Sequence, residues 1–151
     1  MATDGSEGTV GSPSKEVTVT PDLELKLPAR AENVAVVRHA FGGFAEALSV
    51  DEQTLADIKL AVTEACTNVV IHAYDEEEGD LEVDASIDDR LLTVVIRDRG
   101  RGIVPRPDSP GLGLGLPLIA TLAESLELGK DDSDHTEVRM TFALDEDNEI
   151  E

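Results

Sequence analysis

The segment that decides the fold is Glu64-Ala-Cys-Thr-Asn68-Val-Val-Ile-His72-Ala-Tyr74. Within it, Glu64, Asn68 and His72 are each four residues apart, so on an α-helix they share one face. Their neighbours are mostly small or apolar, which places this polar row beside the buried side of the helix. A carboxylate and an amide oxygen one turn apart can hold a hydrated Mg²⁺ and position a hydroxyl group or a water molecule for attack. The alternative interpretation is an ordinary amphipathic helix with a polar edge.

Upstream of this segment the sequence predicts a strand and two helices. The alternating run that begins at Val17 forms a strand that ends at Pro28. Residues 29–48 predict a helix, and residues 52–73 predict a second one that Ser49 or Asp51 can cap. The apolar side chains that we expect to face the core are Leu23, Leu25 and Leu27 in the strand, Val34, Val37, Phe41, Phe44 and Leu48 in the first helix, and Leu55, Ile58, Ala61, Val62, Ala65 and Val69 in the second.

Downstream, residues 81–87 and 91–97 alternate in polarity and predict a β-hairpin with its turn at residues 88–90. A third helix is expected at about residues 116–125, with Pro117 in its first turn. Two further strands are expected near residues 126–128 and 136–144. This order predicts an α+β fold, a two-layer sandwich with the helices on one face of a mixed, mainly antiparallel sheet.

The length of 151 residues suits one compact domain, and 40% hydrophobic residues suffice for a core. We expect a disordered leader at residues 1–16, a domain at residues 17–144 and an acidic tail at residues 145–151. No apolar run is long enough for a membrane span, and the first residues lack the pattern of a secretory signal. The single cysteine, Cys66, is expected to be a small buried side chain, because it can form neither an internal disulfide nor a cysteine-rich metal site. A cytoplasmic location is the expectation.

The chain has 33 acidic and 12 basic residues, which gives a formal net charge of −21. This charge repels the phosphate backbone, so it excludes non-specific nucleic-acid binding. An anionic ligand would have to be held by backbone N–H groups, a helix N-terminus or a bridging cation. The acidity itself has two interpretations, a solvated face with an acidic tail or a halophilic adaptation to high internal salt.

A second motif, Asp98-Arg-Gly100-Arg-Gly102, directly follows a predicted apolar strand. An aspartate in a dry environment at a strand end can accept a hydrogen bond from an amino group. Glycines at 100 and 102 would let the backbone pass close to a flat ligand. The alternative is a plain turn that closes the strand.

A third motif, Gly111-Leu-Gly113-Leu-Gly115-Leu-Pro-Leu-Ile119, has glycines that lead into a helix. Such glycines can present backbone N–H groups to a phosphate, helped by the positive end of the helix. The spacing matches neither a dinucleotide-binding fingerprint nor a P-loop. A flexible hinge without a ligand is the alternative.

In this order and with these separations, the three motifs resemble the N, G1 and G2 boxes of the GHKL ATPase superfamily. The form of the first box, ExCTNVVIHAY, is most similar to the anti-sigma factor serine/threonine kinases of bacteria, which have a histidine kinase-like ATPase domain. The resemblance extends from about Leu25 to Leu144.

This resemblance implies a Bergerat-type site for Mg²⁺ and ATP. Asn68 would coordinate Mg²⁺, and Glu64 would be the general base that accepts the proton of a serine hydroxyl. Asp98 would hydrogen-bond the adenine amino group. The other residues that the resemblance places at the nucleotide are His72 in the N box, Gly100 and Gly102 beside the base, Arg101 and Arg106 toward phosphate charge, Gly111, Gly113, Leu114 and Gly115 in a lid that begins near Ile103, and Thr136 on the adenine side.

The implied activity is phosphorylation of an anti-anti-sigma (STAS-type) protein, coupled to sequestration of a sigma factor or equivalent regulator by a homodimer. A nucleotide-dependent switch that binds partners without phosphorylating them is the alternative. The ATPase half of a histidine kinase is disfavoured because no dimerisation helix precedes the domain. An acidic nucleic-acid mimic would leave the three glycine-bearing motifs unexplained.

Overall fold

The computed structural model describes residues 20–74, 78–100, 112–133 and 135–144. Its elements are, in chain order, β2 (Leu23–Pro28), α2 (Ala31–Ala47), α3 (Glu52–Asn68), η1 (Val69–Ala73), β3 (Asp80–Asp88), β4 (Leu91–Asp98), α4 (Leu112–Leu122), β5 (Ser125–Lys130) and β6 (Thr136–Ala143). The predicted leader, acidic tail and lid start near Ile103 lie outside the described residues. No helix in the described ranges is long and apolar enough to cross a membrane.

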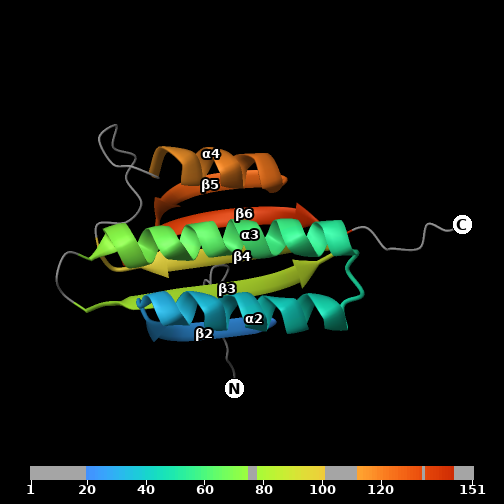
Figure 1. Cartoon of the computed structure of the whole chain (residues 1–151), viewed down its shortest axis with the longest axis horizontal. Coiled ribbons are helices and arrows are strands. Elements are labelled where there is room, and N and C mark those ends of the chain that lie inside the picture. The colour runs from blue at the N-terminus through green and yellow to red at the C-terminus, as the bar shows by residue number, and fades with distance from the viewer. Residues whose placement is uncertain (1–19, 75–77, 101–111, 134, 145–151) are drawn as a thin grey trace, which may run out of the picture.

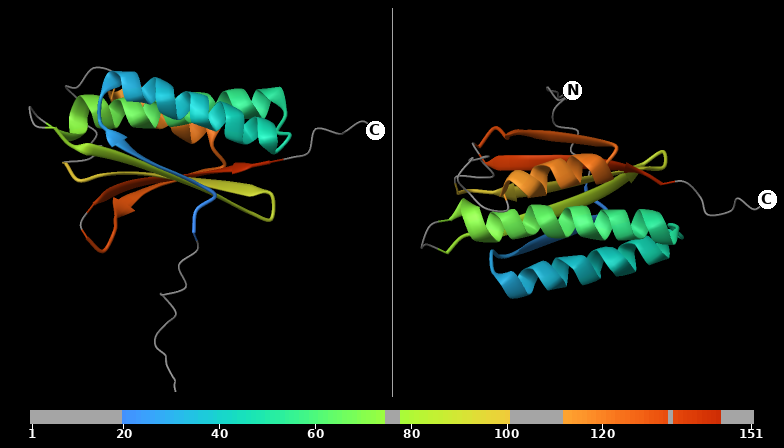
Figure 2. Two further views of the ribbon diagram at one scale, coloured as in Figure 1. Left: turned by 90° about the horizontal axis from the view of Figure 1, so that it is seen from below. Right: turned by 45° about the horizontal axis from the view of Figure 1, so that its top comes forward.

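The five strands form one sheet in the order β2-β3-β4-β6-β5, and the helices cover one of its faces (Figures 1 and 2). The predicted α+β sandwich is therefore confirmed. The expectation of a mixed sheet is wrong for the described strands, because all four neighbouring pairs are antiparallel. The tight β3–β4 connection and the short β5–β6 connection both favour antiparallel pairing.

A row of apolar side chains crosses the whole sheet under the helices. The register aligns Leu25 with Val83, Val83 with Ile96, Ile96 with Val138 and Val138 with Leu128. Since successive strand side chains alternate between faces, residues next to this row point to the open face. The hydrophobic core therefore lies between the sheet and the helix layer.

The predicted helical stripes are buried with a few exceptions. Val34, Val37 and Phe41 are buried, whereas Phe44 packs on the edge of the core. Leu48 was expected in the core and is instead 39% exposed, because α2 ends before it at Ala47. In the second helix the stripe is buried from Ile58 onward, and Leu55 is only partly buried.

The helices differ from the prediction in their boundaries and in one cap: α2, for example, spans Ala31–Ala47 instead of residues 29–48. The predicted helix over residues 52–73 is α-helical only to Asn68 and continues as the π-helical turn η1. Asp51 occupies its N-cap position, yet its side chain makes no capping hydrogen bond. The helix α4 begins at Leu112 rather than at residue 116 and ends at Leu122, so Pro117 lies inside the helix instead of in its first turn.

The turn between β3 and β4 is formed by Asp89 and Arg90, at the predicted position. Both residues have positive φ angles, 55° and 67°. This pair of angles is typical of a type I′ turn, whose twist matches that of a two-residue hairpin. The turn fixes the β3–β4 register and, through it, the position of Asp98 at the far end of β4.

We predict that Val37→Ala lowers the free energy of unfolding by about 2 kcal/mol, because the deleted methyl groups leave a cavity in the core. Val37 is fully buried in α2, and its neighbour Val36 is 46% exposed. Val36→Ala is therefore a matched control, with an expected change within about 0.5 kcal/mol. Urea unfolding measures both, and equal effects would contradict the assigned helix orientation.

Candidate active site

Four elements meet at one end of the molecule, on the left of Figure 1. They are the ends of α3 and β4 and the beginnings of α4 and β6. Among the described residues, the polar side chains that are buried are Asn68 and Asp98, with 5% and 3% exposure. Burial of polar groups costs free energy unless they find partners, so two such residues at one end of the fold indicate a site.

Asn68 is the last residue of α3 and faces α4. Its amide nitrogen is buried and has no hydrogen-bond partner. A Cβ atom built on Gly115 of α4 would lie 2.8 Å from that nitrogen, so glycine is needed there for the two helices to approach. An unsatisfied buried amide costs about 1–3 kcal/mol, which a bound ligand can recover. The structure thus brings together Asn68 and Gly115, two of the residues predicted from sequence.

Asp98 is the last residue of β4 and lies on the helix side of the sheet. It is aligned in the register with Thr136, the first residue of β6. A carboxylate oxygen of Asp98 accepts a hydrogen bond from the backbone N–H of Gly100 at 2.9 Å. The register therefore brings together Asp98 and Thr136, which the sequence places far apart.

Glu64 lies one helical turn before Asn68 and is partly buried. Glu64 and Asn68 share one face of α3, as expected, because both belong to the regular α-helix. His72 lies in η1, where the wider π-helical turn changes the angular spacing, so the predicted continuous helical row is interrupted before it. Ile71, expected beside the buried side, is 60% exposed.

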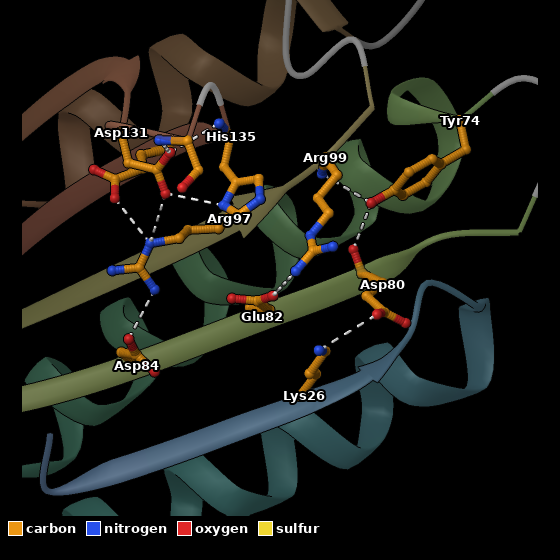
Figure 3. Close-up of polar contacts among 11 residues, drawn as sticks. Lys26, Tyr74, Asp80, Glu82, Asp84, Arg97, Arg99, Asp131 and His135 are labelled. Atoms are coloured by element: carbon orange, nitrogen blue, oxygen red, sulfur yellow. Dashed lines mark hydrogen bonds and ion pairs between the residues drawn. The ribbon is translucent and has the colours of Figure 1, made fainter.

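Tyr74 follows η1, and its hydroxyl contacts backbone atoms of Asp80 and Arg99 (Figure 3). Its hydroxyl donates to the backbone oxygen of Asp80 at 2.7 Å and accepts from the backbone N–H of Arg99 at 2.9 Å. A Cβ atom on Gly100 would collide with the backbone oxygen of Ala73 and lie 3.0 Å from the Tyr74 ring. Glycine at 100 is therefore already required by packing within the chain. Sequence reasoning gave Tyr74 no role, although it ends the first motif.

Arg97 lies on the open face of the sheet and holds a cluster of carboxylates (Figure 3). Its guanidinium contacts Asp84 and Glu137 at 2.8 Å and Asp131 at 4.0 Å, and Asp131 also contacts His135 at 3.0 Å. Partial burial lowers the pKa of Arg97, but its hydrogen bonds with Asp84 and Glu137 outweigh that effect, so the net shift is upward. The Arg97–Glu137 pair directly precedes Asp98–Thr136 in the register.

A hollow of about 590 Å³ also opens on this face, with Val95, Arg97 and Arg139 among its lining residues. It lies on the opposite side of the sheet from Asn68 and Asp98. The segment 101–111, which contains Arg101, Gly102, Arg106 and Gly111, lies outside the described residues. Gly113 and Leu114 lie in the first turns of α4.

The described residues include no group of three or more His, Cys, Asp or Glu side chains that could bind a metal ion by themselves. Mg²⁺, however, is usually held by one or two protein ligands together with substrate phosphates and water. The Asn68 amide oxygen, with Glu64 one turn away, could be such a ligand, while the unpaired amide nitrogen is a donor suited to a phosphate oxygen. The residues present are therefore compatible with Mg²⁺ that arrives with a nucleotide.

An antiparallel sheet with helices on one face is the fold class of the histidine kinase-like (GHKL) ATPase domains. The histidine kinase-like ATPase domain family matches residues 27–142, and the chain belongs to this family. Serine-protein kinase RsbW of Bacillus thuringiensis (strain Al Hakam) is 33% identical over 125 residues, which cover 73% of this chain and 78% of the relative. RsbW of Bacillus anthracis (strain CDC 684) gives the same figures. The chain is thus homologous to the RsbW serine-protein kinases.

Solved structures agree on the fold. The structure of the RsbU and RsbW domains of a Mycobacterium tuberculosis protein matches with a TM-score of 0.66 and 23% identity, over 83% of this chain and 33% of that one. A histidine kinase domain of a blue-light activated kinase from Erythrobacter litoralis matches with a TM-score of 0.50 and 19% identity, over 78% of this chain and 61% of that one.

We predict that Cys66 does not react with a thiol reagent in the native protein at mildly alkaline pH. The side chain is fully buried in α3, and this burial raises the pKa of its thiol to about 12. The same reagent should modify one thiol per chain in urea, since the sequence has one cysteine. Rapid native labelling would show that the helix bearing Glu64 and Asn68 opens readily.

Proposed function

We propose that the protein is a Mg-ATP-dependent serine/threonine kinase of the anti-sigma factor type. It phosphorylates an anti-anti-sigma (STAS-type) protein and sequesters a sigma factor or equivalent regulator. The observation that carries the proposal is the pair of buried polar side chains, Asn68 and Asp98, at the end of the sandwich where Glu64 also lies. Homology to serine-protein kinases supports the choice of reaction.

In this proposal, residues at the end of β4 and the start of β6 recognise adenine. The Asp98 carboxylate accepts a hydrogen bond from the adenine amino group, which is selective because the carboxylate is shielded from water. Thr136, beside Asp98 in the sheet, contacts the same side of the base. Gly100 and Gly102 are proposed to lie beside the base, and His72 to support the site from η1.

In this proposal, backbone N–H groups, two arginines and a bound cation meet the charge of the phosphates. Gly113, Leu114 and Gly115 lie at the N-terminal end of α4, where backbone N–H groups and the helix dipole favour an anion, and Gly111 is proposed to bind the phosphates with them. Arg101 and Arg106 contribute positive charge from the segment between the motifs. Asn68 would hold Mg²⁺ as a neutral ligand, and the ion when bound neutralises charge on the transferring phosphoryl group.

Glu64 accepts the proton of the attacking serine hydroxyl in this mechanism. The bond between the γ-phosphorus and the bridging oxygen breaks as the serine oxygen bonds to phosphorus, and ADP leaves. Asn68, one turn along α3, fixes the position of the phosphate relative to Glu64. The active species in this proposal is a cytoplasmic homodimer.

We predict that Glu64→Gln slows phosphoryl transfer by about 10²–10⁴-fold, because it removes the base and keeps the shape of the side chain. ATP affinity should stay near that of the wild type. Glu52→Gln, on the exposed first turn of the same helix, is the matched control and should retain activity.

The measurement is the mass of a STAS-type protein incubated with enzyme, ATP and Mg²⁺, alongside calorimetry of ATP binding. Full activity of the Glu64→Gln variant would overturn the role of Glu64 as base. A wild-type protein that binds ATP and leaves every STAS-type partner unmodified would instead favour the switch that binds without phosphorylating.

We also propose that the net charge of −21 reflects adaptation to high internal salt. Salt screens repulsion among exposed charges, so the melting temperature should rise from about 0.1 M KCl to multimolar KCl. Thermal melts followed by circular dichroism measure this directly. A melting temperature independent of KCl would leave the acidic residues as an ordinary solvated face.

A further inference from the structure

Tyr74 lies at the junction of η1, β3 and β4, and the proposed chemistry leaves its side chain without a role. We propose that Tyr74 is a positioning residue that fixes the turn after Asp98 and thereby sets the preference for adenine over guanine. This inference rests on the proposed ATP-binding function.

The Tyr74 hydroxyl is inserted at the point where β3 and β4 separate. Their last aligned pair on this side is Leu81 with Asp98. One residue further out, the hydroxyl donates to the Asp80 oxygen and accepts from the Arg99 N–H, at 2.7 and 2.9 Å (Figure 3). The Tyr74 hydroxyl thus replaces the next direct backbone hydrogen bond between β3 and β4, so the two strands stay connected where they diverge.

Two glycines make room for this arrangement. A Cβ atom on Gly79 would collide with the Tyr74 ring, and one on Gly100 would collide with the backbone oxygen of Ala73, next to that ring. The π-helical turn η1 ends at Ala73, and Tyr74 directly follows it in this position. A phenol is protonated and able to donate at neutral pH, and partial burial raises the pKa of Tyr74 further above its ordinary value.

The link to Asp98 runs through adjacent backbone groups. Tyr74 holds the N–H of Arg99, and the next N–H, that of Gly100, donates to the Asp98 carboxylate at 2.9 Å. The orientation of the carboxylate thus depends on the turn that Tyr74 fixes. Adenine presents an amino donor where guanine presents a carbonyl oxygen, so a fixed acceptor favours adenine and a carboxylate free to tilt discriminates less.

The first test is Tyr74→Phe, which removes the hydroxyl and keeps the ring. We expect the ATP dissociation constant to rise about 10-fold, the range of one lost hydrogen bond. GTP binding should change much less, so the ATP-to-GTP preference falls. Turnover at saturating ATP should stay near that of the wild type, since Glu64 and Asn68 are untouched. Calorimetry with each nucleotide and Mg²⁺, and kinetics with a STAS-type substrate, measure these effects.

The second test is Gly79→Ala, which displaces the ring and should lower the same preference. Its matched control is Gly43→Ala on α2, where a Cβ atom would meet nothing within 4 Å and nucleotide binding should be unchanged. The chain has one tyrosine and no tryptophan, so the tyrosine band in near-ultraviolet circular dichroism reports the displacement directly.

The outcomes separate this inference from the proposed function. Absence of ATP binding by the wild type would overturn the proposed function itself. Normal ATP binding by the wild type, with an unchanged ATP-to-GTP preference in Tyr74→Phe, would overturn the positioning role alone. An equal loss of affinity for both nucleotides would also overturn it, because a merely structural contact predicts that result.

Discussion

The candidate site depends on the burial of two polar side chains at the edge of an otherwise apolar core. Asn68 and Asp98 are almost fully buried, in the interface between the helix layer and the sheet. Such burial is unfavourable unless each group gains partners, so the surroundings must supply them or leave room for a ligand. The Gly100 N–H satisfies part of Asp98, whereas the Asn68 amide nitrogen remains unsatisfied. Asn68 therefore has a buried donor that an external acceptor at this end of the fold could satisfy.

The sheet register determines whether Asp98 is buried at all. A slip of one residue between β4 and its neighbours would turn Asp98 to the open face and bury Arg97. On the helix face, the apolar row across the strands opposes such a slip. On the open face, the ion pairs between Arg97 and its carboxylates oppose it as well. The ionic cluster on the open face and the candidate site on the helix face therefore stabilise the same alignment.

Hydrophobic alternation predicted the strands and the β3–β4 hairpin, although β2 begins at Leu23 and not at Val17, and helical spacing predicted the layer of helices. The buried positions of Asn68 and Asp98 agree with the predicted motifs, because both end a regular element whose periodicity is clear. Periodicity could not reveal η1, since a π-helical turn depends on local packing rather than on composition. The start of α4 was missed because glycines disfavour helices intrinsically, and contact with α3 overrides that preference. Tyr74 was missed because its partners are backbone atoms brought together only by the fold.

The acidity of the chain constrains how it could bind a nucleotide. Arg97 is a strongly held cation near the strand ends, yet it points to the open face and is surrounded by three carboxylates. It is therefore unsuited to meet phosphate charge on the helix side. With 33 acidic residues against 12 basic ones, a site made of lysines and arginines would also compete with the protein's own carboxylates. Backbone N–H groups at the start of α4 and a divalent cation on a neutral asparagine avoid that competition. This gives a physical reason for an amide at position 68, rather than an acidic side chain in addition to Glu64 and Asp98.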